Sequence, residues 1–86
     1  MHYVYILKSG KDGKLYIGYT KNLVERIEQH NRGKNFSTAN RKPFHLVYFE
    51  GFKSQKDATN REKQLKQFKS SYGQLKKRIV NSLCEM

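Results

Sequence analysis

The fold is decided by the stretch HYVYILKSGKDGKLYIGYT, which spans residues 2–20. Aromatic and branched residues dominate both ends of this stretch, as is typical of β-strands. Its centre, Lys11-Asp12-Gly13-Lys14, is typical of a turn, because glycine accepts a positive φ at little cost. The stretch therefore predicts a β-hairpin with strands over residues 2–8 and 14–20.

The alternation of side chains predicts what each face of this hairpin carries. A connection of two or four residues places Val4 and Ile6 on an apolar face, and brings Tyr5 and Tyr16 together on the opposite face. A three-residue connection would mix the two faces, so we exclude it. Gly18 then leaves a gap beside the tyrosines, where a ligand can approach closely.

A helix and a basic loop follow the hairpin. Asn22 and Glu25 have the spacing of a capping box, and Gly33 is a typical C-terminal stop. The apolar stripe of this helix consists of Leu23, Val24 and Ile27. We expect a polar, basic loop over Lys34–Lys42.

A third strand and two further helices complete the pattern. Phe44–Phe52 is apolar on both faces, so we expect a well-covered strand. Ser54 and Asp57 form a second capping box at the start of the next helix. The core-facing stripe of that helix consists of Ala58, Leu65 and Phe68. The last helix begins at Ser70 or Ser71 and carries Tyr72, Leu75, Ile79 and Leu83 on one side.

The predicted fold is thus α/β, with a small three-stranded, mainly antiparallel sheet flanked by three helices in the order ββαβαα. A chain of 86 residues has room for one domain, which we expect to cover residues 1–86. The sequence contains no internal repeat and no linker.

The charge of the chain indicates its partner. Eighteen Lys or Arg residues against seven Asp or Glu residues give a net charge of +11, and nine of the basic residues lie within residues 53–78. Such a charge attracts polyanions through long-range fields and counterion release, so nucleic acid is the predicted partner. A charge that serves only solubility is the alternative.

Other classes of function and location are disfavoured. No basic helix carries the bulky apolar face that insertion into a membrane surface requires, and no stretch is long enough to span a membrane. Cys84 is the only cysteine, so no internal disulfide forms. No signal peptide is visible. These features favour a reducing, cytoplasmic compartment.

Glu62 is the most informative single residue. It lies within the apolar stripe of its helix, where a carboxylate is costly unless it is paired or bound to a metal. The structural interpretation is a salt bridge to Arg26 or Arg61. The functional interpretation is a hard cation such as Mg²⁺, which often takes one protein carboxylate together with water and phosphate oxygens.

Arg26 and His30 are four residues apart on the first helix and so project side by side. A guanidinium suits the charged transition state of phosphoryl transfer, and an imidazole can orient a tyrosine hydroxyl or pass a proton. Taken alone, however, such a histidine is more often a capping or surface residue. We interpret His45 as structural and His2 as terminal and inert. A tyrosine becomes a general base only if its pKa of about 10 falls toward neutrality, which costs ~4 kcal/mol for three units.

Together these motifs resemble the GIY-YIG nuclease domain, and in particular its small stand-alone members. The N-terminal domain of the incision subunit of bacterial excision repair is similar. The first motif is Tyr3-Val4-Tyr5, with Tyr3 where the family usually has glycine, and the second is Tyr16-Ile17-Gly18. Residues 19–31 and 58–66 are also similar, so the resemblance covers roughly residues 2–70.

The resemblance implies a metal-dependent endonuclease that hydrolyses phosphodiester bonds, with branched or damaged DNA as the candidate substrate. It implies that Tyr5 and Tyr16 are the active-site tyrosines, and Tyr16 is preferred as the group that activates water. Arg26 would stabilise charge on the scissile phosphate, and His30 would support the tyrosines. Glu62 would hold a single Mg²⁺ or Mn²⁺ ion.

Two other functions stay open at the level of the sequence. The missing glycine at Tyr3 and the lack of an attached specificity domain allow a non-catalytic, basic nucleic-acid-binding module with the same fold. A third possibility is an accessory subunit recruited by a protein partner that supplies specificity. Family members often have a late asparagine in the site, but the context of Asn81 does not match, so that role is not transferred. The sequence leaves open whether DNA or RNA is bound, and also the oligomeric state.

Overall fold

The structure is a computed structural model, which describes residues 1–35 and 38–85. Its three strands are β1 (His2–Ser9), β2 (Leu15–Thr20) and β3 (Phe44–Phe52), in the spatial order β2-β1-β3. Both pairings are antiparallel. The predicted α/β fold with a three-stranded antiparallel sheet is therefore confirmed, and β1 is the central strand.

The register of the hairpin confirms the predicted faces. Ile6 pairs with Ile17 on one side of the sheet, whereas Tyr5 pairs with Gly18 on the other. The backbone N–H of Ser9 donates to the carbonyl of Lys14 at 2.9 Å, which leaves a connection of four residues. An even-numbered connection is what the segregation of apolar and aromatic side chains requires.

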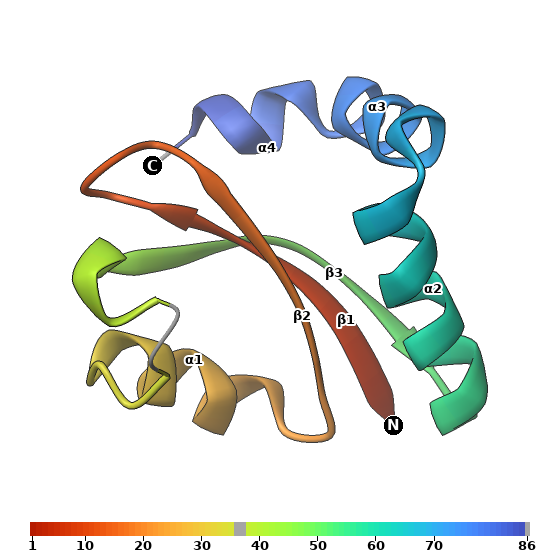
Figure 1. Ribbon diagram of the computed structural model, residues 1–86, viewed down its shortest axis with the longest axis horizontal. Coiled ribbons are helices and arrows are strands. Elements are labelled where there is room, and N and C mark those ends of the chain that lie inside the picture. The colour runs from red at the N-terminus through yellow and green to blue at the C-terminus, as the bar shows by residue number, and fades with distance from the viewer. Residues whose placement is uncertain (36–37, 86) are drawn as a thin grey trace.

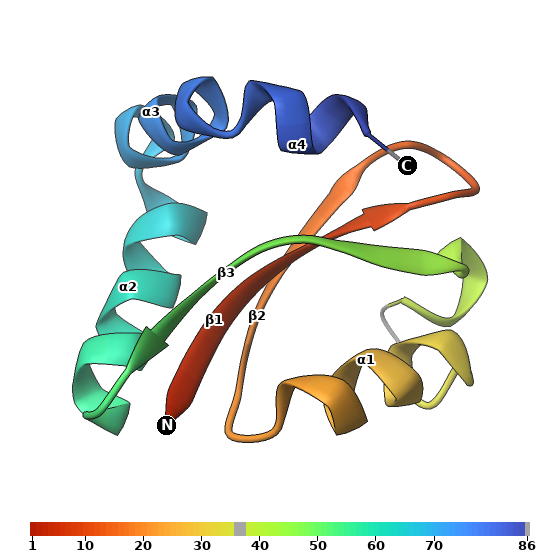
Figure 2. The ribbon, with the colours of Figure 1, turned by 180° about the vertical axis from the view of Figure 1, so that it is seen from behind.

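Helices cover both faces of the sheet (Figure 1). Helix α1 (Leu23–Asn31) lies on one side, and α2 (Gln55–Gln67), α3 (Lys69–Arg78) and α4 (Val80–Cys84) lie on the other. The view from behind in Figure 2 shows the same three layers, with β3 now in front. The single last helix of the prediction is wrong, because the backbone at Ile79 leaves helical geometry with φ −116° and ψ 25°.

We call the two sides of the sheet the α1 face and the α2 face, after the helices that cover them. The α2 face carries an apolar core, built from Val4, Ile6, Ala58, Leu65, Leu75 and Ile79. On the α1 face a smaller cluster forms, built from Tyr5, Leu7 and Phe44 with Tyr16, Leu23 and Ile27 packed against it. Burial of this apolar area on both sides of one thin sheet is the main stabilising term of the fold.

Three expectations about packing are wrong. Val24 is 70% exposed and Phe68 is 56% exposed, so neither belongs to its predicted stripe. In β3, Leu46 and Phe49 are 37% and 49% exposed, because this strand lies at the edge of the sheet and its register shifts by one residue opposite Ile6 and Leu7. A strand that is apolar on both faces is thus only partly covered.

Only one of the two hydrogen bonds of the capping box forms at the start of α1. The Asn22 side chain accepts a hydrogen bond from the Glu25 N–H at 3.1 Å, as predicted. The Asn22 N–H, however, donates to the Thr20 hydroxyl at 3.1 Å, and the Glu25 carboxylate accepts from Gln29 at 3.4 Å. The backbone N–H of Asn22 still has an acceptor, because the Thr20 hydroxyl has taken the place of the glutamate carboxylate.

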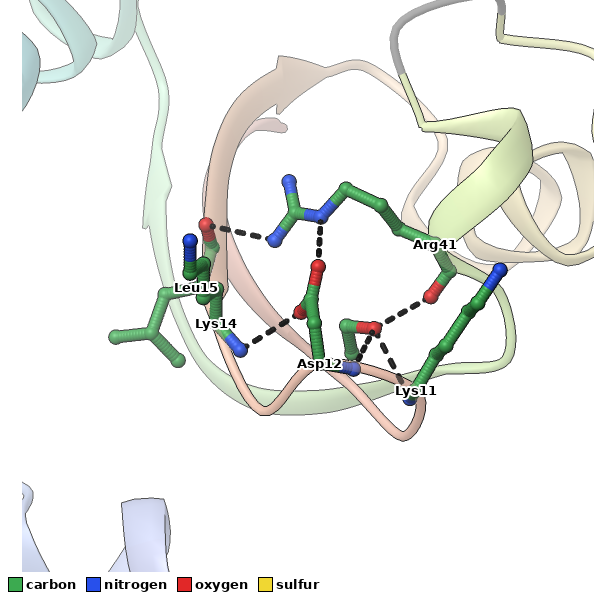
Figure 3. A network of polar contacts seen from close by, with 6 residues as sticks. Lys11, Asp12, Lys14, Leu15 and Arg41 are labelled. Atoms are coloured by element: carbon green, nitrogen blue, oxygen red, sulfur yellow. Dashed lines mark hydrogen bonds and ion pairs between the residues drawn. The ribbon is translucent and has the colours of Figure 1, made fainter.

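The hairpin connection is tied to the loop that follows α1. Arg41 donates to the Asp12 carboxylate at 2.9 Å and to the Leu15 carbonyl at 3.4 Å (Figure 3). The Ser9 hydroxyl donates to the Arg41 carbonyl. Arg41 ends a short 3-10 helix, Ala39–Arg41, inside the loop predicted over Lys34–Lys42. Within that loop, residues 36 and 37 lie outside the described residues.

Candidate active site

Tyr5 lies at the centre of the α1 face and is only 1% exposed. Its neighbour on β2 is Gly18, and a Cβ atom added at Gly18 would overlap the Tyr5 hydroxyl. Glycine is required here because the phenol lies across the backbone of the neighbouring strand. The predicted opening for a ligand beside Gly18 is therefore wrong, because the Tyr5 side chain fills this space.

His30 is fully buried and joins β1 to the loop after α1. Its Nε2 atom lies 3.0 Å from the Tyr5 hydroxyl, and its Nδ1 atom lies 2.8 Å from the Thr38 hydroxyl. The Thr38 hydroxyl in turn donates to the Asn35 carbonyl at 3.4 Å. This direction leaves Nδ1–H as the donor to Thr38, so Nε2 accepts from Tyr5. The alternative interpretation of His30 as a surface or capping residue is wrong.

The imidazole of His30 is neutral at physiological pH. Burial lowers the pKa of His30 to about 4, and the positive charge of Arg26 acts in the same direction. A neutral ring can accept from one hydroxyl while it donates to another, which a protonated ring cannot do. His30 is thus equipped to orient the Tyr5 hydroxyl.

Tyr5 itself is unsuited to act as a general base. Burial raises the pKa of Tyr5 to about 12, and the nearby Tyr16 and Glu62 also raise it. The Arg26 guanidinium lowers this pKa through a side-chain hydrogen bond, but burial dominates. The requirement for a pKa near neutrality is not met at Tyr5.

Tyr16 lies beside this network without being locked into it. Its ring packs edge-on against His30 at 4.9 Å and at a tilt against Tyr5 at 6.4 Å, measured between ring centroids. Tyr16 is half-buried, and within residues 1–35 and 38–85 no hydrogen bond engages its hydroxyl. Of the two tyrosines, Tyr16 is the one whose hydroxyl can meet a solvent molecule or a substrate.

Arg26 extends from α1 toward the same place. Its Nη1 atom donates to Gln29 Oε1 at 2.9 Å, which holds the guanidinium plane. The guanidinium lowers the pKa of Tyr5 through a side-chain hydrogen bond, and its positive charge lowers the pKa of His30. The predicted side-by-side arrangement of Arg26 and His30 is confirmed, and both side chains reach the tyrosines.

Glu62 forms neither of the salt bridges that its structural interpretation required. Arg61 binds Glu50 instead, with its Nε atom 3.0 Å from the carboxylate. Glu62 pairs with Lys66, one turn further along α2, at 3.1 Å. The Lys66 ammonium lies 6.0 Å from the centroid of the Tyr16 ring, so this pair stands next to the tyrosines although α2 covers the opposite face.

The Glu62 carboxylate has the donor chemistry of a Mg²⁺ ligand. Its side chain is 23% exposed and already binds a cation, the Lys66 ammonium. Among the described residues, no three or more His, Cys, Asp or Glu side chains lie close enough together to hold a metal ion. A cation held here would therefore take one protein carboxylate and complete its shell with water and phosphate oxygens, which is a common arrangement for Mg²⁺.

Other candidates lie away from this cluster or were missed. His45 is exposed on β3, and the Nδ1 atom of His2 lies 2.8 Å from the Tyr19 hydroxyl. Asn81 and Cys84 are exposed on α4. Sequence reasoning missed Thr38, Lys66 and Gln29. For Lys66 the spacing of four from Glu62 was an available signal, whereas the loop residue Thr38 follows no periodic pattern.

None of the helices in the described part of the chain is both long and apolar enough to cross a bilayer.

Comparison with known proteins shows the family to which the chain belongs. The family model of the GIY-YIG catalytic domain matches residues 1–78. UPF0213 proteins of Staphylococcus aureus strains Mu3 and N315 are each 44% identical over 68 residues, which covers 78% of this chain and 82% of theirs. The solution NMR structure of a UPF0213 protein from Bacillus halodurans is 39% identical. Its TM-score is 0.55, with 86% of this chain and 80% of that chain covered. The chain belongs to the GIY-YIG family, a nuclease family.

Proposed function

We propose that this protein is a metal-dependent endonuclease that hydrolyses phosphodiester bonds in DNA. The observation that carries the proposal is the convergence of Tyr5, Tyr16, Arg26, His30 and Glu62, which come from both sides of the sheet. Structural ion pairs and core packing do not require such a cluster. The net charge of +11 supplies the attraction for a polyanionic substrate.

The side chains divide the work by their surroundings. Tyr16 has the hydroxyl that no described residue engages. We propose that this hydroxyl first loses its own proton to solvent and that the phenolate then takes a proton from the attacking water. His30 holds the Tyr5 hydroxyl in place, Tyr5 positions the Arg26 guanidinium through a side-chain hydrogen bond, and Arg26 binds oxygens of the scissile phosphate. Water attacks phosphorus, the P–O bond to the leaving strand breaks, and the leaving oxygen takes up a proton from solvent. Positioning and charge neutralisation supply most of the rate enhancement.

Glu62 is the residue that would hold a divalent cation, with Mg²⁺ or Mn²⁺ as the fitting ions. When bound, such a cation neutralises negative charge on the phosphate and its leaving oxygen. Lys66 must release the Glu62 carboxylate for this to occur, and a pair in which Lys66 is 48% exposed separates at little cost.

The test is cleavage of labelled single-stranded, duplex and branched DNA by the pure protein with Mg²⁺ or Mn²⁺. Tyr16→Phe and Glu62→Gln should each lower the rate at least about 100-fold while leaving the fold intact. Phe68→Ala, an exposed position at the end of α2, is the matched control and should cleave like the wild type. Absence of cleavage in every metal, or undiminished cleavage by Glu62→Gln, would contradict the proposal.

The second candidate function is a non-cleaving nucleic-acid-binding module. The observation in its favour is the ion pair between Glu62 and Lys66, which gives the carboxylate a structural partner. This function predicts salt-dependent DNA binding with no turnover in any metal, and binding by Glu62→Gln equal to that of the wild type. The first proposal extends to a branched or damaged substrate and to a role in repair. It also includes a cytoplasmic location and a protein partner that supplies specificity. The substrate panel above addresses the first of these.

A further inference from the structure

An exposed aromatic hollow lies on the α1 face beside the candidate active site. Its volume is about 320 Å³, and it is lined by Tyr3, Lys21, Asn22, Leu23, Val24 and Phe49. Phe49 is 49% exposed and Val24 is 70% exposed. Large apolar side chains left open to solvent on one surface indicate a binding site.

The hollow is built around a pair of rings. Tyr3 and Phe49 meet edge-on with their centroids 5.9 Å apart. The register fixes where this pair stands, because Phe49 is directly opposite Tyr5, and Tyr3 is two residues before Tyr5 on the same strand. Directly opposed residues have Cα atoms about 5 Å apart. The rings therefore adjoin Tyr5, and with it the candidate active site, on the same face of the sheet.

The polar border of the hollow matches a nucleotide. Lys21 lines the hollow and is exposed, so its ammonium is available to bind a phosphate. The side-chain oxygen Oδ1 of Asn22 caps α1. The side-chain nitrogen Nδ2 has no hydrogen bond within the described residues and can donate to the edge of a base. Aromatic rings with a neighbouring cation are the recurrent arrangement for stacking an unpaired base.

We propose that this hollow is a subsite for one unpaired nucleobase of the substrate strand, stacked on the Phe49 ring and packed against Tyr3. A base inside a duplex has both faces covered by its neighbours, so it cannot cover these rings without leaving the helix. The subsite therefore selects single-stranded or unpaired nucleotides next to the bond that is cut. This inference deepens the proposed function, since it names the substrate class of the same site.

The experiment measures binding of a short single strand that carries one 2-aminopurine, and of the same sequence as a duplex. Both are bound to the Glu62→Gln protein, so that no cleavage interferes. Adding Phe49→Ala should weaken single-strand binding about 5- to 100-fold, and should abolish the fluorescence quenching that stacking causes. Duplex binding should change less than about twofold, because phosphate contacts remain.

Phe68→Ala is the matched control, since Phe68 has the same side chain and is 56% exposed at the junction of α2 and α3. It should leave single-strand binding unchanged. Equal losses for Phe49→Ala and Phe68→Ala, or equal losses on single strand and duplex, would overturn the subsite. A stable dimer that Phe49→Ala dissociates would also overturn it, because a second copy of the chain would then cover the rings.

The outcome separates the subsite from the proposed function. Single-strand binding that depends on Phe49, in a protein that cleaves nothing, supports the subsite and refutes the nuclease. Cleavage that is indifferent to Phe49→Ala supports the nuclease and refutes the subsite.

Discussion

The two faces of the sheet share the central strand β1, but its side chains have different surroundings on each face. On the α2 face, Val4 and Ile6 of β1 meet apolar side chains from three helices and form an apolar core. On the α1 face, Tyr5 of the same strand meets a buried histidine and an arginine. Every buried side-chain polar atom among the described residues nevertheless has a partner. The comparison teaches that one face supplies most of the stability, whereas the other gives up apolar packing for buried polar groups that the proposed reaction would use.

The largest effect should come from the α2 face. Leu65 is 2% exposed in the centre of the core, so Leu65→Ala should lower the free energy of unfolding by about 2–5 kcal/mol. For a domain of this size that is a large part of the total. Urea unfolding followed by circular dichroism measures it. Phe68→Ala on the same helix should change stability by no more than about 0.5 kcal/mol, and a loss as large as that of Leu65→Ala would break the comparison.

Arg26 offers the converse test on the α1 face. Arg26→Ala should lower kcat/KM for DNA cleavage about 100- to 1,000-fold, because the negative charge on the phosphate is then no longer stabilised by the planar guanidinium. Arg26→Lys should recover only part of the rate, since an ammonium restores the charge but not the two-pronged hydrogen bonding. Steady-state kinetics beside urea unfolding gives both quantities. A drop in stability that matches the drop in rate would show that Arg26 is structural.

Acid should affect the α1 face before it affects the core. The folded pKa of His30, about 4, lies below its ordinary value of about 6.5, so the fold favours the neutral ring. Stability is complete above about pH 6.5 and is lost as the pH falls toward 4. Between pH 7 and pH 5 the free energy of unfolding should fall by about 2 kcal/mol.

Urea unfolding at pH 7, 6 and 5 follows this change. His30→Asn should be less stable at pH 7, and its stability should vary little between pH 7 and pH 5. An unchanged slope in His30→Asn would assign the acid sensitivity to another group. The pKa of Glu50 is lowered by its hydrogen bonds to Arg61 and Tyr48, so its own contribution is lost only at a lower pH.

The smallest effect on stability should come from the residue that links the two faces. Lys66→Gln removes an ion pair on the surface of α2, which should cost no more than about 0.5 kcal/mol. The same change frees the Glu62 carboxylate, so half-maximal cleavage should need less Mg²⁺. Titration of the rate with Mg²⁺ measures the shift. A higher Mg²⁺ requirement in Lys66→Gln would show that the lysine assists the site.

Periodic patterns could be predicted from the sequence, and the remaining contacts could not. Alternation in the hairpin separated Tyr5 from Val4 and Ile6, and an even-numbered connection fixed the register. Helical spacing placed Arg26 beside His30. These are local rules, and the chain obeys them because each apolar residue needs a buried side.

Contacts between distant segments escaped prediction. Thr38 binds His30 from a loop, where no repeat indicates which side chain turns inward. Arg61 binds Glu50 of β3 rather than its neighbour Glu62, and this pairing appears only when β3 and α2 are packed together. Phe49 is exposed because its strand lies at the sheet edge, and strand order is a property of the whole fold.

The position of β1 in the middle of the sheet has a consequence for how this protein can change. Successive residues of β1 serve the core and the tyrosine cluster in turn. Insertion or deletion of one residue within β1 would exchange those assignments for everything downstream in the strand. Such an event would damage stability and chemistry in a single step, so β1 can vary in composition but not in length. Drift in length, and any module added by engineering, would have to be accommodated outside this strand.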